Sequence, residues 1–242
     1  MSKLYGPFKI INNNSGKGSN GSKLFDIQFL NTCYIAKHVR RDHIKDGNIK
    51  DRTFDIGVIG KTFTSKSYGD FKVLYEVRRN SHNIVYRIKF IKTGYETDSW
   101  LTSIRAREVL DPLYPRVQGV GYLGLDYYII RKQDSELYKA LKQKWQNMFN
   151  RCYNSNYDAY KSYGAIGVTI DKRWHNFSNF YKDAQKLDGY NREAIISNNG
   201  IHLDKDLKQL NIPKENRVYS KDTCTWLKPS VNIKLAVTKN SN

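Results

Sequence analysis

The chain has 242 residues, with 41 Lys and Arg against 23 Asp and Glu, a formal net charge of +18. No apolar run approaches the roughly 20 residues that span a bilayer, and residues 1–22 lack the apolar core of a signal peptide, so we expect no membrane partner. The odd number of cysteines, Cys33, Cys152 and Cys224, argues against a disulfide framework and a Cys-rich zinc site and favours a reducing cytosol.

The charge and the aromatic content together indicate a folded protein with a polyanionic partner. A net charge this far from zero repels itself, and folding alone does not explain it. Aromatic residues make up 13% of the chain, including 18 Tyr, whereas a disordered basic tail has few. Nucleic acid fits this balance, and nothing in the sequence implies a protein partner.

The first half of the chain contains an internal repeat. Residues 5–11 recur as 68–74, 25–34 as 86–95, 44–51 as 104–111, and 56–60 as 117–121. The offset between the copies falls from 63 to 61 and then 60 residues over the first three pairs, as expected when loops differ in length between two copies of one unit. We therefore predict two small, related β-rich units at residues 1–62 and 63–126.

Each unit opens with strand-like sequence. Residues 25–29 and 86–90 alternate apolar with polar side chains, the period of a half-buried strand. A short helical piece is expected near 42–45 and near 103–109. The candidates for DNA contact in the two units are Arg40, Arg41, Lys45, Arg105 and Arg107. These cations are either an ordinary solvated surface or a phosphate-binding one, and the large excess of positive charge favours the second.

A helix-containing region is predicted at residues 134–242. Leu137, Leu141, Trp145, Met148 and Cys152 recur every three or four positions, which places them on one helix face. Asp134 or Ser135 is the candidate N-cap. A short strand at 168–170 and a helix near 177–186 follow. Arg151, Lys172, Arg173 and Arg217 are further candidates for DNA contact.

The last part of the chain gathers metal-competent side chains. Residues 201–206 read Ile-His-Leu-Asp-Lys-Asp, an apolar strand that ends in acidic groups. A second strand is predicted at 216–220 and a short helix at 229–236, with Pro229 in its first turn. The order is strand, strand, helix, with Asp204 at the end of the first strand and Asn232 in the helix.

This order resembles the HNH, or ββα-metal, nucleases, and most of all the phage HNH homing endonucleases. In that family an Asp or His ends the first strand, an Asn in the helix is a second ligand, and a Trp stands six positions before it, as Trp226 does before Asn232. The motifs Trp145-x-x-Met-x-x-Arg-Cys-Tyr, Tyr163-Gly-x-x-Gly-Val and Trp174-x-x-Phe-x-x-Phe also resemble sequence that precedes the nuclease motif in phage proteins.

The resemblance implies an α+β protein with a ββα core at about 198–238, encoded by a phage and acting in the host cytoplasm. Asp204 and Asn232 would hold one Mg²⁺ or Mn²⁺, hard ions that prefer oxygen ligands. The reaction would be hydrolysis of a phosphodiester in double-stranded DNA at a specific site. One site and one metal favour nicking by a monomer, although a dimer could cut both strands.

The chain departs from the family at the general base. The residue after the metal-binding Asp is usually His, and here it is Lys205. His202 shares a strand face with Asp204 and is the preferred base. Lys205 would need a lowered pKa to act as a base, and otherwise contacts phosphate. Asp206 is a candidate for holding a metal-bound water or orienting a partner.

Other interpretations of the sequence stay open. Asp204 and Asp206 would be a solvated turn if no metal bound there. The alternative functions are a non-catalytic, sequence-specific DNA-binding regulator and an RNA-binding or junction-resolving protein. Retained binding without Mg²⁺-dependent cutting would identify the first, and substrate competition would identify the second.

Overall fold

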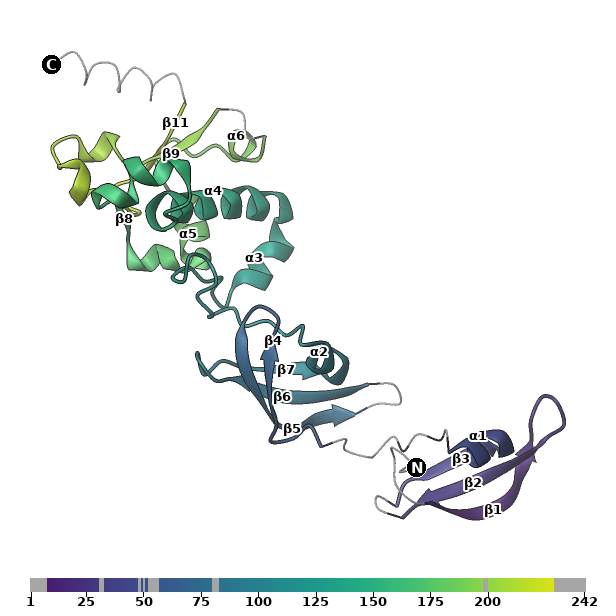
Figure 1. Ribbon diagram of the computed structural model, residues 1–242. Helices are drawn as coiled ribbons and strands as arrows, with labels where there is room; N and C mark the ends of the chain where they lie inside the picture. Colours follow the sequence, from purple (N-terminus) through teal and green to yellow (C-terminus); the bar gives the residue numbers. More distant parts are fainter. Residues whose placement is uncertain are drawn as a thin grey trace. The chain divides into compact units, whose positions relative to one another are not determined.

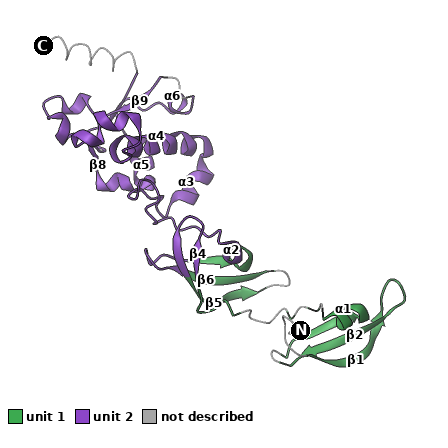
Figure 2. Cartoon of the chain, in the orientation of Figure 1, with its two compact units in different colours: residues 1–62, 72–88, 97–102 green, residues 63–71, 89–96, 103–242 purple. Residues whose placement is uncertain are grey.

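A computed structural model describes residues 8–30, 33–47, 49, 51, 57–79, 83–197 and 200–228. The fold is a mixture of several small β-sheets and helices, in agreement with the α+β class (Figure 1). The chain divides into two compact units (Figure 2), one of residues 1–62, 72–88 and 97–102 and one of residues 63–71, 89–96 and 103–242. Within the described residues, no helix is both long and apolar enough to cross a membrane.

The first sheet has three strands and is followed by a short helix. Its elements are β1 (Phe8–Lys17), β2 (Lys23–Phe29), β3 (Ile35–Arg40) and α1 (Arg41–Asp46). The strands lie in the order β1-β2-β3, and both pairings are antiparallel. Ile27 and Phe29 alternate with polar residues on β2 and are fully buried, together with Ile49. The strand predicted at 25–29 is therefore confirmed.

The second sheet repeats this order with one more strand. Its elements are β4 (Thr62–Ser65), β5 (Gly69–Arg79), β6 (Ile84–Phe90), β7 (Glu96–Trp100) and α2 (Leu101–Ala106), with strand order β4-β5-β6-β7. Ile88 and Phe90 are fully buried, which confirms the strand predicted at 86–90. Sequence patterns missed β3, β4 and β7. The helix expected at 103–109 begins and ends earlier, at 101–106.

The two sheets also share local geometry. The backbone N–H of Phe29 donates to the carbonyl oxygen of Tyr34 at 2.9 Å, and that of Phe90 donates to the carbonyl oxygen of Tyr95 at 2.8 Å. In each pair the rings stack with centroids 6.3 Å apart. The turn between the paired residues contains a positive φ in both cases, 59° at Cys33 and 72° at Gly94. The described residues at these two places thus share one hydrogen bond, one ring stacking and one positive φ.

The rest of the chain is built around one long helix. The helices are α3 (Tyr127–Gln133), α4 (Ser135–Tyr153), α5 (Phe177–Ala184) and α6 (Arg192–Ile196). Short strands are β8 (Thr169–Ile170), β9 (His202–Asp204), β10 (Val218–Tyr219) and β11 (Thr225–Leu227). The 3₁₀ turns are η1 (Asp158–Ser162), η2 (Gly164–Ile166), η3 (Lys172–His175), η4 (Leu207–Gln209) and η5 (Lys214–Asn216).

Helix α4 forms where the spacing of apolar residues predicted it. The Asp134 side chain accepts from the backbone N–H of Leu137 at 3.0 Å, so Asp134 is the N-cap. The five residues predicted to share a face, Leu137, Leu141, Trp145, Met148 and Cys152, are all buried. The Trp145 indole N–H donates to the carbonyl oxygen of Trp174 at 2.7 Å, which satisfies its polar edge inside the core.

The strand pairing near the C-terminus differs from the prediction. Strand β9 pairs antiparallel with β11, with Asp204 opposite Thr225 and Leu203 opposite Trp226. Within the range 216–220 only Val218–Tyr219 is a strand, and it pairs parallel with β8. The prediction that 216–220 is the second strand of the unit was wrong, because that partner is β11. The helix expected at 229–236, with Asn232, lies outside the described residues.

The three cysteines are free. Cys152 and Cys224 are buried, and Cys33 is exposed. Burial raises the pKa of each buried thiol to about 12. Neither thiol is ionised at neutral pH, so both are inert packing residues.

Candidate functional site

The strand pair β9–β11 is anchored to the core through Trp226. The indole N–H of Trp226 donates to the carbonyl oxygen of Ala184 at 2.8 Å, and its backbone N–H donates to that of Asp188 at 2.9 Å. Trp226 itself is 2% exposed. The end of α5 therefore fixes β11, and β11 in turn fixes the position of Asp204 on β9.

Asp204 is held in one orientation by a turn. It is 6% exposed, and its Oδ1 accepts the backbone N–H groups of Asp206 at 3.0 Å and Leu207 at 2.8 Å. This Asx-type turn is the structural alternative to a metal site. The two roles are compatible, because a carboxylate has a second oxygen, Oδ2, with which to meet a cation.

The described residues fit part of a one-metal site. Asp204 supplies one hard oxygen donor of the kind that Mg²⁺ prefers. Across the ranges that the structure describes, no group of three or more His, Cys, Asp or Glu lies close enough together to hold a metal ion. The second proposed ligand, Asn232, lies outside those ranges, so the described residues provide only one of the two proposed protein ligands.

The residues that follow Asp204 form a buried ion cluster. Oδ1 of Asp206 lies 2.8 Å from Nζ of Lys205 and 2.8 Å from Nη1 of Arg217. The Lys205 and Arg217 side chains are only 5% and 7% exposed. The Lys205 ammonium also lies over the rings of Tyr163, at 4.8 Å, and Tyr219, at 5.4 Å. Both cations point into the protein.

This cluster gives its members a structural role. Arg217 also donates from Nε to the carbonyl oxygen of Ile212 at 3.0 Å, which closes the loop after β9. A phosphate group cannot reach either cation without breaking these contacts. The geometry therefore points away from the expected roles of Lys205 and Asp206 in catalysis, and away from contact between Arg217 and DNA.

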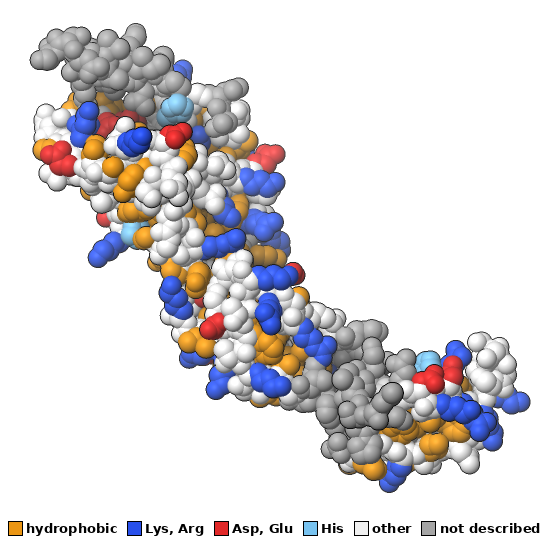
Figure 3. All heavy atoms as spheres, viewed as in Figure 1, with side chains coloured by type: hydrophobic (Ala, Val, Ile, Leu, Met, Phe, Trp, Pro, Cys, Tyr) orange, Lys and Arg blue, Asp and Glu red, His pale blue; other side chains and the backbone are white. Residues whose placement is uncertain are grey.

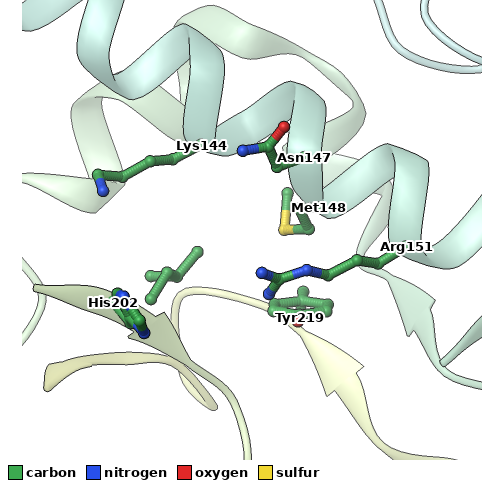
Figure 4. A pocket seen from close by; sticks show the side chains of 7 residues that line it. Lys144, Asn147, Met148, Arg151, His202 and Tyr219 are labelled. Carbon is green, nitrogen blue, oxygen red and sulfur yellow. The ribbon is translucent and has the colours of Figure 1, made fainter. Parts of the chain in front are cut away.

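A small cavity lies beside β9. It has a volume of about 150 Å³, and its lining includes Lys144, Asn147 and Arg151 of α4 and His202 of β9. In Figure 4 the side chains of Lys144, Asn147 and Arg151 come from one helix, the Arg151 guanidinium lies above the Tyr219 ring, and His202 lies on a strand across the cavity from the helix. Among the described residues that line the cavity there is no Asp or Glu.

The two cations of this cavity lie in a partly buried setting. Burial lowers the pKa of Lys144, and the positive charge of Arg151 lowers it further. Nζ of Lys144 donates to the carbonyl oxygen of Ile201 at 3.3 Å. The Arg151 guanidinium lies 5.5 Å above the centre of the Tyr163 ring. Two like charges with no acid in the lining favour an anion of the size of a phosphate group.

Sequence reasoning found two of the polar residues of this cavity, Arg151 and His202, and missed Lys144 and Asn147. Lys144, Asn147 and Arg151 recur at the three- and four-residue spacing of one helix face. That stripe lies beside the apolar one on α4 and would have identified both missed residues.

The other predicted DNA contacts are all exposed, and two of them pair with a carboxylate. Arg40 is paired with Asp42 at 2.7 Å and Arg173 with Asp183 at 2.8 Å. The remaining exposed candidates are Arg41, Lys45, Arg105, Arg107 and Lys172. Arg41 and Lys45 share helix α1, and Arg105 lies in helix α2. On the face shown in Figure 3, Lys and Arg side chains outnumber Asp and Glu.

Comparison with known protein families, with curated proteins and with solved structures gave no match for this chain.

Proposed function

We propose that this protein is a site-specific DNA endonuclease of the HNH type, which hydrolyses one phosphodiester with one divalent metal ion. The observation that carries the proposal is the position of Asp204. Its carboxylate lies at the end of β9, and His202 of the same strand lines a cavity that contains two cations and no acid among its described residues. Asp204 is not in the described lining of this cavity, but it stands two residues from His202 on the same strand, and this is the basis for proposing a metal ion next to the bound phosphate.

The residues of this site divide the chemistry among them. Lys144 and Arg151 bind the phosphate oxygens, and Arg151 is fixed for this by the rings around it. His202 accepts the proton of the attacking water. Asp204 and Asn232 would hold the Mg²⁺ or Mn²⁺ ion, which would supply charge stabilisation at the phosphorus and to the departing 3′ oxygen.

The two β-rich units are proposed as copies of one DNA-binding module. The order of three strands and a short helix recurs, and so does the turn at Phe29–Tyr34 and Phe90–Tyr95. Each copy exposes cations on its helix, Lys45 in α1 and Arg105 in α2. Two modules read a longer site than one, and their phosphate contacts make binding strongly dependent on salt.

The proposal is tested with supercoiled plasmid. The wild type should convert it to the open-circular form in Mg²⁺ and leave it intact in EDTA. Asp204→Asn should bind DNA in a gel-shift assay and fail to nick it, because the amide keeps an oxygen for the turn and loses the charge. Asp222→Asn is the matched control, since Asp222 is an exposed carboxylate in the same region.

Two further variants assign the base. His202→Gln should lower the nicking rate about 100-fold to 10,000-fold, the usual contribution of a general base. Lys205→Met should keep the wild-type rate per folded molecule, because its ammonium is buried. Nicking by Asp204→Asn at the wild-type rate would eliminate the metal site.

A specific observation favours a second candidate, a non-catalytic DNA-binding regulator. Oδ1 of Asp204 is used in a turn, and among the described residues no group of three or more His, Cys, Asp or Glu could hold a metal ion. Under this alternative the wild type binds DNA equally well in Mg²⁺ and EDTA and leaves the plasmid intact in both.

A further inference from the structure

A second and larger cavity lies on the other polar side of α4. Its volume is about 440 Å³, within the range of about 300–1,000 Å³ in which proteins bind small molecules. Its lining includes Tyr68, the loop from Tyr114 to Leu123, and polar residues of α4. It contains none of the residues assigned to the proposed nuclease site.

Aromatic rings form part of the wall of this cavity. The rings of Tyr68 and Tyr114 meet edge to face, with centroids 6.3 Å apart. The Arg116 guanidinium lies 5.4 Å from the centre of the Tyr68 ring and donates to its hydroxyl group at 3.3 Å. Tyrosine rings and planar guanidinium groups are the surfaces on which unpaired bases stack.

Side-chain amides face the same space. Nε2 of Gln118 donates to Oδ1 of Asn150 at 2.8 Å, and Gln143 and Gln146 of α4 also line the cavity. An amide presents both donors and an acceptor, so it can pair with the edge of a base. Four amides around one cavity suit a ligand with several hydrogen-bonding atoms.

The charge of this cavity is positive. Arg116 and Lys142 are its cations, and among the described residues that line it none is acidic. Burial lowers the pKa of Lys142, and the positive charges of Arg116 and Arg131 lower it further. Cations placed together without an acid in the wall are stabilised by an anionic ligand.

The loop that forms one wall of the cavity is fixed by its close packing on α4. A Cβ at Gly121 would lie 2.9 Å from both the Trp145 and the Phe149 rings, so only glycine lets the loop pack this closely on α4. A Cβ at Gly69 would lie 3.0 Å from the Tyr114 ring. The wall is thus set by the folded backbone, and little of it needs to be ordered on binding.

We propose that this cavity receives one unpaired nucleotide of a bound nucleic acid. The base lies against Tyr68 and Arg116 and pairs with the amides of Gln146 and Asn150, and the adjoining phosphate lies between Arg116 and Lys142. The proposal uses the nucleic-acid partner of the proposed function and does not depend on its metal site.

The test measures binding by fluorescence anisotropy in EDTA, so that cleavage plays no part. The probes are a short DNA duplex, the same duplex with one bulged thymidine, a short single-stranded oligothymidylate and its RNA counterpart. The wild type should bind the bulged duplex more tightly than the paired one. With 5-iodouracil at the bulge, irradiation should cross-link the probe to Tyr68 or Tyr114.

Variants separate stacking from charge. Tyr68→Ala should weaken binding to the bulged duplex about 5-fold to 100-fold, the usual contribution of one stacked base, and leave the paired duplex unchanged. Tyr68→Phe should restore binding, because it keeps the ring. Lys142→Gln should weaken bulge binding more than Lys139→Gln, which removes an exposed charge from the same helix.

Three results would overturn the proposal. They are equal affinity of the wild type for the bulged and paired duplexes, cross-links that avoid the cavity, and a folded Tyr68→Ala or Gln146→Ala variant with wild-type preference for the bulge. Stronger binding to the RNA strand than to DNA would still support the nucleotide site and would show that the nucleotide comes from RNA. A protein that passes these tests and fails to nick plasmid would retain this site without the nuclease.

Discussion

Replacing Asp206 with Asn tests whether the ion cluster after β9 is structural. The change removes the one carboxylate that lies 2.8 Å from both Lys205 and Arg217. The two cations, 5% and 7% exposed, would then be buried beside each other without a counter-charge. Removing one partner of a buried ion pair costs about 3–5 kcal/mol in free energy of unfolding.

The Asp206 side chain is 37% exposed, so water screens part of the interaction. We therefore expect a loss of about 2–3 kcal/mol, below the full range for a buried pair. With a denaturant slope of roughly 2 kcal/mol per molar, the urea midpoint should fall by about 1–1.5 M. Adding Lys205→Met to Asp206→Asn should recover part of this loss, because one unpaired cation is removed.

The assay is urea unfolding followed by tryptophan fluorescence. The matched control is Asp222→Asn, whose carboxylate is 77% exposed and lies 3.6 Å from Lys221, and which should cost less than about 0.5 kcal/mol. If Asp206→Asn shifts the midpoint no more than this control, the cations do not depend on Asp206. Lys205 would then again be a candidate for contact with phosphate.

Three other groups of substitutions have expected outcomes. Gly164→Ala should lower the free energy of unfolding in urea by at least about 2 kcal/mol, because the added Cβ would lie 2.1 Å from a backbone oxygen of α4. In the control Gly119→Ala the added Cβ meets nothing within 4 Å, so this change should cost only the roughly 1–2 kcal/mol of left-handed strain. Burial raises the pKa of Asp183, but hydrogen bonds to an arginine and an indole lower it by more, so the pKa is lowered overall. The stability that this ionised carboxylate contributes is therefore present above the unfolded pKa of about 3.9 and is lost as pH falls through the lower folded pKa. Asp183→Asn should make the free energy of unfolding depend less on pH in the acid range. An unchanged pH dependence would contradict this. Lys45→Gln and Arg105→Gln should each reduce the slope of log affinity against log salt by about 1, and an unchanged slope would remove that residue from the DNA contact.

Local patterns in the sequence predicted the elements whose buried residues recur with a regular period over a short stretch of chain. The alternation at 25–29 and 86–90 gave β2 and β6, and the spacing from Leu137 to Cys152 gave α4. These signals are strong because one face of each element is buried. Strands β3 and β7 were missed because most of their side chains are exposed or half-buried and lack an apolar period.

Pairings between distant segments could not be predicted in the same way. Strand β10 pairs with β8, and the two lie far apart in sequence. No local feature of Val218–Tyr219 distinguishes this partner from β9. The burial of Lys205 was equally hidden, because the Tyr163 and Tyr219 rings that cover its ammonium come from two other segments. A lysine next to an aspartate in sequence is more often solvated.

The assignment of Asp204 as a metal ligand is tested by a titration with Mn²⁺, in which electron paramagnetic resonance reports the free ion in the presence of DNA. Wild-type protein and Asp222→Asn should each remove one equivalent of free Mn²⁺ from solution beyond the amount that the DNA alone binds. Asp204→Asn, with its overall fold intact by circular dichroism, should leave that equivalent free. Equal uptake by Asp204→Asn and the wild type would show that the ion is not held by Asp204, and the proposed nuclease site would be rejected.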